Sequence, residues 1–308
     1  MENLAHCRLT GGWHVKSDEV MVPFFRRFVA LYDSLEKLWE ERRTERIAAN
    51  LLILAFLSSI VLIELARQGW LPPEVAALLP RNHYYAINTA LSMLLGLEVF
   101  GLVFSLAKSV SVSVGKQFEI LSLILLRHSF SELVYFSEPL VWAEALKPVL
   151  LMLAYAGGGL LIFLLLGVYY RLQHHRAITR DKEAAADFIA VKKIISLLLL
   201  LIFFVTGAID GVKYLKGTAT NDFFSLFFTI LIFSDLLLVL ISLRYSSSYP
   251  IVFRNSGFAV ATLLIRLALT APPYFSVLLG IGAIAFAIGI TFAYNRFEHP
   301  DVQRSAHL

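Results

Sequence analysis

Charge and cysteine are scarce in this sequence. Charged residues make up 16% of the 308 positions, against roughly 25% in soluble globular domains. The single cysteine, Cys7, excludes an intramolecular disulfide and a cluster of thiol ligands. The first 46 residues lack the basic and then apolar start of a secretory signal, so we expect no cleaved signal peptide.

Motifs of known enzyme classes are missing as well. The chain contains no His-Glu-x-x-His zinc motif, no Gly-x-Ser-x-Gly nucleophile elbow, no P-loop and no dinucleotide-binding fingerprint. No histidine lies well inside an apolar run, which argues against haem. The adjacent His174 and His175 would point to different faces of a helix and make a poor metal site. We therefore expect no enzymatic activity, no metal or other cofactor, and no nucleic-acid partner.

Apolar residues are abundant instead, at 58% of the chain. They form long runs, and about 20 such residues are needed to cross the hydrocarbon layer of a bilayer. The six longest runs cover residues 47–65, 84–107, 149–170, 194–208, 223–243 and 275–294. Two shorter stretches, 117–136 and 255–271, each contain an arginine. The pattern predicts an all-α integral membrane protein embedded in the lipid bilayer.

The distribution of lysine and arginine predicts the topology, because these residues collect in the cytoplasmic loops of membrane proteins. If both shorter stretches span, basic-rich and basic-poor loops alternate along the chain without exception. We therefore predict eight transmembrane helices with both termini in the cytoplasm. The expected location is the plasma membrane, which is the inner membrane if the source is a prokaryote.

The second half of the chain repeats landmarks of the first half in the same order. Each half has an acid followed by a Ser-Leu pair, then an apolar run that ends in arginine, then a helix that opens at proline and contains glycine. The matching residues are Glu98 and Asp235, Arg127 and Arg266, Pro148 and Pro273, and Gly157 and Gly282. Because four spans is an even number, the two copies would be parallel repeats, as occur in some transporters.

This organisation divides the chain into five segments. The two four-helix membrane units are residues 47–171 and 193–296, joined by a basic cytoplasmic linker, 172–192, and followed by a cytoplasmic tail, 297–308. The cytoplasmic segment 1–46 contains an amphipathic helix, since apolar residues recur there at helical spacing. They are Phe24, Phe28, Leu31, Leu35 and Leu38. This helix would lie on the inner leaflet or dock against the loops of the protein itself.

Ionisable residues at membrane depth are the candidate functional residues. Glu98 and Asp235 lie roughly ten residues from the inner ends of their helices, which at about 1.5 Å per residue is near mid-membrane. Arg127 and Arg266 reach a similar depth. A charge there costs at least about 2.5–3.5 kcal/mol. We therefore predict two intramembrane ion pairs, Glu98–Arg127 and Asp235–Arg266. The second acidic partners nearer the outer surface would be Glu64 and Asp210.

Two functions fit such pairs. In the first, the pairs line an ion pathway in a protein that transports or conducts a small ion or solute between two pseudosymmetric four-helix units. Alternatively, they are structural clamps in a non-catalytic membrane anchor or regulatory subunit, with another membrane protein or a second copy as its partner. Three consecutive glycines at 157–159 leave a similar choice between close helix packing and a broken helix that binds substrate.

Overall fold

The computed structural model describes residues 18–297, except 78, 109, 174–181, 216–222 and 246–248. Throughout this described part the regular secondary structure is helical, as the sequence predicts. The α-helices are α1 Asp18–Trp39, α2 Arg42–Arg67, α3 Pro73–Ala76, α4 Tyr84–Ser105, α5 Val110–Ser131, α6 Trp142–Leu172, α7 Lys182–Leu215, α8 Phe223–Tyr245, α9 Tyr249–Thr270 and α10 Pro273–Phe297. A 3₁₀ turn, η1 Glu132–Tyr135, follows α5.

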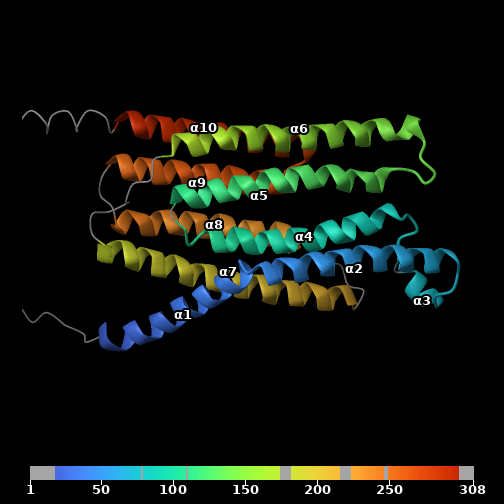
Figure 1. Ribbon diagram of the computed structural model, residues 1–308, viewed down its shortest axis with the longest axis horizontal. Coiled ribbons are helices and arrows are strands. Elements are labelled where there is room, and N and C mark those ends of the chain that lie inside the picture. The colour runs from blue at the N-terminus through green and yellow to red at the C-terminus, as the bar shows by residue number, and fades with distance from the viewer. Residues whose placement is uncertain are drawn as a thin grey trace, which may run out of the picture.

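The long helices lie side by side in an elongated bundle (Figure 1). Helix α5 packs against α4, α6 and α9, and α9 packs against α5, α8 and α10. Helix α6 also packs against α10, α2 against α4, and α7 against α8. Figure 1 shows that α4, α6, α8 and α10 end toward one end of the bundle, whereas α2, α5, α7 and α9 end toward the other. The chain therefore reverses direction from one long helix of the bundle to the next.

Seven helices of the described chain are long and apolar enough to cross a membrane, which identifies a multi-pass membrane protein. They are Arg42–Arg67, Tyr84–Ser105, Trp142–Leu172, Phe188–Lys213, Phe223–Ser242, Tyr249–Thr270 and Pro273–Arg296. The predicted stretch 117–136 is absent from this set. The structure has α5 there, a helix of 22 residues that ends at Ser131 and carries Lys116, Glu119 and Arg127. A count of eight spans remains a prediction.

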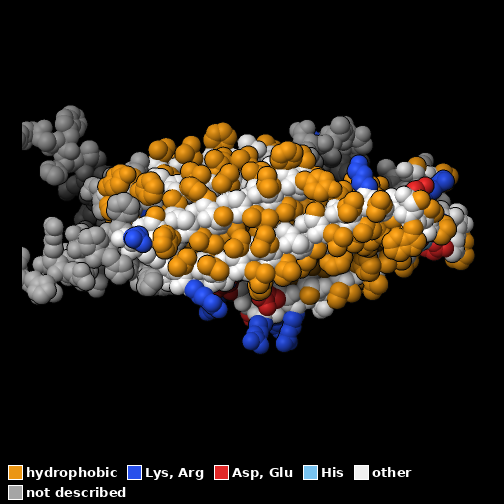
Figure 2. Space-filling model, turned by 90° about the horizontal axis from the view of Figure 1, so that it is seen from above, with side chains coloured by type: hydrophobic (Ala, Val, Ile, Leu, Met, Phe, Trp, Pro, Cys, Tyr) orange, Lys and Arg blue, Asp and Glu red, His pale blue; other side chains and the backbone are white. Residues whose placement is uncertain are grey.

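Peripheral and central helices differ in composition because they meet different surroundings. Leu51, Leu54 and Leu57 of α2 are all more than half exposed, as suits side chains that face lipid. Helix α5, by contrast, buries Ser113, Gln117 and other polar residues. Figure 2 shows hydrophobic side chains over most of the visible face, with charged side chains gathered at a few places along its edge and near its ends. Polar groups are therefore tolerated on α5 because neighbouring helices cover them.

Two of the three glycines at 157–159, Gly158 and Gly159, allow helices to pack closely. Helix α6 continues unbroken from Trp142 to Leu172, so the chain has no broken helix at this point. A Cβ atom on Gly159 would lie 2.9 Å from the backbone oxygen of Ser122 in α5, and one on Gly158 would collide with Val277 of α10. Their small size thus allows α6 to approach both neighbours.

Helix α1 docks on α4 and α7 through two aromatic side chains outside the apolar stripe, and the stripe remains a candidate for contact with the inner leaflet. Tyr32 is fully buried, and its hydroxyl donates a hydrogen bond to the backbone oxygen of Phe104 at 2.9 Å. The ring of Trp39 stacks on Phe104 with a centroid distance of 6.1 Å. Leu31 and Leu38, part of the predicted apolar stripe, remain exposed. Two aromatic side chains on another face therefore attach α1, and burial raises the pKa of Tyr32.

Candidate functional site

Two ion pairs cross helix boundaries inside the bundle, and they join the residues that the sequence analysis paired. Arg127 of α5 contacts Glu98 of α4, and Arg266 of α9 contacts Asp235 of α8. The Nε of Arg266 donates to Oδ2 of Asp235 at 3.3 Å. The second pair is the more deeply buried, since the side chain of Arg266 is 0% exposed and that of Arg127 is 30% exposed.

The guanidinium of Arg266 is only partly satisfied. Its Nη1 and Nη2 are buried, and neither has a hydrogen-bond partner among the described residues. The same holds for Oε1 of Gln117 on the neighbouring helix α5. Buried polar groups are almost always hydrogen-bonded to protein or to ordered water. A water molecule or an ion beside either group would therefore be stabilised.

The Glu98–Arg127 pair borders a cavity of about 70 Å³ between α4 and α5, here called the Glu98 cavity. Apart from the pair, four of its seven lining side chains are polar. The full set is Asn88, Leu91, Ser92, Leu95, Glu98, Ile124, Arg127, His128 and Ser131. It reaches from the middle of α4 to the last residue of α5.

Asp235 borders a second, half-open cavity of about 50 Å³, here called the Asp235 cavity, which is lined by Leu106 and by residues of α5, α7, α8 and α9. Its polar lining residues are Ser113, Gln117, Lys192, Asp235, Ser242, Asn255 and Thr262. Lys192 is 4% exposed, and its Nζ donates to the backbone oxygen of Lys108 at 2.7 Å. Gln117 donates to the hydroxyl of Ser113 at 3.3 Å. Both charged and neutral hydrogen-bonding groups thus converge here.

One face of α5 lines both cavities. The residues that border the Asp235 cavity are Val110, Ser113, Val114 and Gln117, and those that border the Glu98 cavity are Ile124, Arg127, His128 and Ser131. Each set follows the spacing of three and four residues that keeps side chains on one helix face. The two sets are separated by one heptad, from Gln117 to Ile124, or about 10 Å of helix rise.

Apolar side chains occupy that face of α5 between the cavities. Ile120 and Leu121 lie in the interval, and Leu121 is buried. Ile120 faces α4, because a Cβ atom on Gly101 would lie 3.5 Å from its Cδ1. The two polar cavities therefore lie toward opposite ends of α5, with a short apolar barrier between them.

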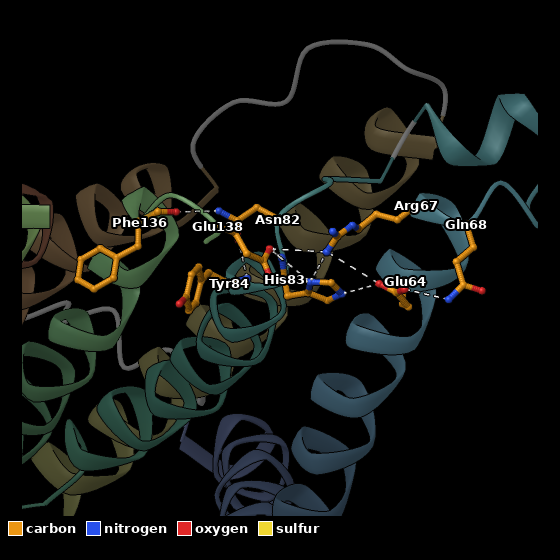
Figure 3. A network of polar contacts seen from close by, with 8 residues as sticks. All are labelled: Glu64, Arg67, Gln68, Asn82, His83, Tyr84, Phe136 and Glu138. Carbon is orange, nitrogen blue, oxygen red and sulfur yellow. Dashed lines mark hydrogen bonds and ion pairs between the residues drawn. The ribbon is translucent and has the colours of Figure 1, made fainter. Parts of the chain in front are cut away.

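Glu64 does not join the Glu98–Arg127 pair as the sequence analysis expected. It belongs to a separate network at one end of the bundle (Figure 3), where its Oε2 lies 3.2 Å from Nε2 of His83. The other ring nitrogen of His83 lies 3.0 Å from Oε1 of Glu138 and 3.1 Å from Nη1 of Arg67. Hydrogen bonds from His83 lower the pKa of Glu138. This network connects the loops before α4 and before α6.

Asp210, the other expected acidic partner, lies on α7. Within the described part of the chain it forms neither an ion pair nor a hydrogen bond with Asp235 or Arg266. The structure thus pairs each intramembrane arginine with a single acid rather than two. Cys7, His174 and His175 lie outside the described residues.

Gln117 and Lys192 line the Asp235 cavity, although neither residue was expected from the sequence to do so. Lys192 was assigned to the linker 172–192, whereas α7 begins at Lys182 and carries Lys192 inside the helix. The polar residues of α5 offered a signal, because Ser113, Gln117 and Ser131 share a face with His128. That face becomes recognisable once α5 is known to lie among other helices.

Comparison with known proteins gives no relative of this chain. The chain matches no protein-family model, no curated protein and no solved structure.

Proposed function

We propose that this protein transports or conducts a small ion across the membrane, along the face of α5 that borders both cavities. The observation that carries this proposal is the placement of two polar cavities on a single face of one helix, toward its two ends. Ionisable residues inside a membrane bundle usually mark an ion or substrate route. Here each cavity contains one member of an ion pair or both.

The size of the cavities favours an ion over an organic solute. Their volumes are about 50 and 70 Å³. A cavity needs about 10–15 Å³ to hold one water molecule, whereas pockets for small organic ligands measure about 300–1,000 Å³. Each cavity thus has room for a few water molecules or one small ion. The proposed cargo is therefore inorganic.

The apolar interval at Ile120 and Leu121 favours gated movement over an open pore. A hydrophobic constriction can stop conduction by excluding water. Passage of an ion would require α5 to shift relative to α4, where Ile120 packs near Gly101. The packing of these two helices is then the element that opens and closes the path.

The packing of the bundle supports α5 as an eighth span and supports a duplication. In the first half, α2 packs on α4, α4 on α5, and α5 on α6. In the second half, α7 packs on α8, α8 on α9, and α9 on α10. The largest contacts between the halves join equivalent helices, α6 with α10 and α5 with α9, and smaller ones join α4 with α7 and α5 with α10. Two parallel four-helix repeats would produce the main pattern, and we propose that their termini are cytoplasmic and that the membrane is the plasma membrane.

Ion flux into proteoliposomes tests the proposal, under a membrane potential and a pH gradient. Glu98→Gln and Asp235→Asn should change the flux by tenfold or more, with rates normalised to folded protein. Glu144→Gln is the matched control, because Glu144 is an exposed acid on α6 that lines neither cavity. Equal flux from the wild type and all three variants would contradict an ion route past the two ion pairs.

A role as a membrane anchor or regulatory subunit is the second candidate, and the exposure of α2 favours it. Ile63 is the single buried residue of this helix in the structure, so most of its surface is free for lipid or a partner. The ion pairs would then be clamps. This function predicts a partner that co-purifies in stoichiometric amount, and a Glu98→Arg, Arg127→Glu exchange that restores the amount of folded protein.

A further inference from the structure

Lys192 is the buried cation of the Asp235 cavity that has no acidic partner in the described part of the chain. The lysines around it are neutralised. Lys193 lies 2.6 Å from Asp33, Lys108 lies 3.0 Å from Glu40, and Lys116 pairs with Glu119. The described contacts of the Lys192 ammonium are the backbone oxygen of Lys108 and the ring of Phe188, whose centroid is 4.8 Å away.

Among the described side chains the cavity therefore carries one uncompensated positive charge. Asp235 is the single acid among its described lining residues, and Arg266 already neutralises that carboxylate. An uncompensated charge buried away from water is strongly unfavourable. A bound anion would remove that imbalance, whereas a metal cation would increase it.

Hydrogen-bond donors gather at the Lys192 end of the cavity. An ammonium has three N–H donors, and the backbone of Lys108 takes one of them. Ser113 accepts from Gln117, which leaves its hydroxyl hydrogen to donate. The side-chain oxygen of Asn255 accepts from Arg254 at 3.5 Å, which leaves its amide N–H groups. These three side chains come from three helices, α5, α7 and α9.

The acceptors lie toward the other end of the cavity. On α5, Gln117 is one turn beyond Ser113, and on α8, Asp235 is two turns from Ser242. The cavity thus has a donor end and an acceptor end. An anion at the donor end would be separated from the carboxylate of Asp235, which Arg266 screens.

We propose that the donor end of the Asp235 cavity binds a small inorganic anion of halide size, held by Lys192, Ser113 and Asn255. The volume of about 50 Å³ limits the ligand to one small ion with little hydration. The identification of this anion as the transported ion rests on the proposed function, whereas its binding does not.

Binding is tested on the full-length protein in detergent, with chloride as the probe. A ligand that binds only the folded state raises the unfolding temperature as its concentration increases. Replacing gluconate by chloride at constant ionic strength should therefore raise the unfolding temperature of the wild-type protein. Gluconate is too large for the cavity and serves as the reference. An unfolding temperature that is independent of chloride would overturn the proposal without any variant.

Two neighbouring lysines provide the variant test. Lys192→Gln should weaken chloride binding tenfold or more, and Lys192→Arg should keep most of it because the charge remains. Lys193→Gln is the matched control, since Lys193 is next in the chain but pairs with Asp33. If Lys192→Gln bound chloride as tightly as the wild type, the site would be elsewhere and the proposal would be wrong.

Flux measurements separate this inference from the proposed function. Chloride binding without ion flux in proteoliposomes would retain the anion site and remove the transport function. Flux of protons or metal cations, with no effect of chloride on unfolding, would retain transport and remove the anion site. Chloride flux that is lost in Lys192→Gln and kept in Lys193→Gln would support both.

Discussion

Gln117 and Ile124 lie one heptad apart on the same face of α5, and each borders a different polar cavity. Between them the face is apolar. Helix α5 therefore has two properties. It is the least hydrophobic of the long helices near the centre of the bundle, and it contributes residues to the lining of both cavities. This position explains why a helix that packs among apolar neighbours carries Arg127 and buries Gln117.

Shortening the apolar barrier should create a leak. Ile120→Ala removes the side chain that faces Gly101 of α4, so water should enter the interval between the cavities. We expect ion flux in proteoliposomes to increase about tenfold, equivalent to roughly 1.4 kcal/mol of barrier. Leu123→Ala is the control, because Leu123 lies on the same helix but is 44% exposed. An increase of the same size in both variants would point to general loosening of α5.

Breaking the two ion pairs should have unequal effects on stability. Asp235→Asn leaves the fully buried Arg266 without a counter-charge, and breaking a buried pair costs about 3–5 kcal/mol. Glu98→Gln should cost less, since Arg127 retains some exposure. Thermal unfolding in detergent measures both. Replacing both members, as in Asp235→Leu with Arg266→Met, should recover much of the loss. A larger loss in Glu98→Gln than in Asp235→Asn would contradict the burial of the second pair.

Adjacent glycines of α6 should respond differently to a methyl group. A Cβ on Gly159 would lie 2.9 Å from the backbone oxygen of Ser122, whereas one on Gly157 has no neighbour within 4 Å. Gly159→Ala should therefore destabilise the protein by about 1–3 kcal/mol. Gly157→Ala should be neutral or stabilise by up to about 1 kcal/mol, since alanine favours helix. Unfolding temperatures in detergent should be lower for Gly159→Ala than for Gly157→Ala. Equal unfolding temperatures for the two variants would mean that α5 lies farther from α6.

The network around His83 should make stability depend on pH. Hydrogen bonds from the side chain and backbone of His83 lower the pKa of Glu138 in the folded state. The stabilisation is therefore present above the unfolded carboxyl pKa of about 4.3 and is lost as the pH falls through the lower folded value. The difference in unfolding temperature between wild type and Glu138→Gln should be largest near neutral pH and should shrink in acid. If the difference in unfolding temperature increased as the pH falls, the pKa of Glu138 would be raised and not lowered in the folded state.

Attachment of α1 should depend on Tyr32. Tyr32→Phe removes the hydrogen bond to Phe104 and should cost about 0.5–1.5 kcal/mol. Tyr32→Ala should expose α1 to added protease at a higher rate. Leu31→Ala is the neighbouring control, because Leu31 is 51% exposed and should change neither measurement. Protection of α1 that survived Tyr32→Ala would assign the attachment to Trp39.

The membrane class and the partners of Arg127 and Arg266 could be anticipated from the sequence because both follow from one constraint. Long apolar runs require lipid, and a charge at membrane depth requires a partner on a neighbouring helix. Depth along each helix was enough to match Arg127 with Glu98 and Arg266 with Asp235. Helix α5 was harder to assign, because its polar residues are stabilised by neighbours that no local pattern describes.

Some residues have roles that depend on where a helix begins or on which of its faces packs against the bundle, and these roles could not be anticipated in this way. Lys192 follows a run of charged residues and resembles part of a loop, but α7 starts ten residues earlier and turns it into the bundle. Tyr32 lies beside a regular leucine stripe that is more apolar, so the stripe was the better local candidate for docking. Glu64 was assigned by its position in the duplication, although His83 and Arg67 at the bundle end attract it.

If one face of α5 carries an ion, chemical modification of a side chain on that face should block the flux. Ser131→Cys, in a Cys7→Ser background, places a thiol in the lining of the Glu98 cavity, and Leu123→Cys places one on the exposed face of α5. Ion flux in proteoliposomes is measured before and after a water-soluble thiol reagent. We expect at least a tenfold loss of flux for Ser131→Cys and no loss for Leu123→Cys. Undiminished flux after complete labelling of Ser131→Cys would contradict an ion route along this face of α5.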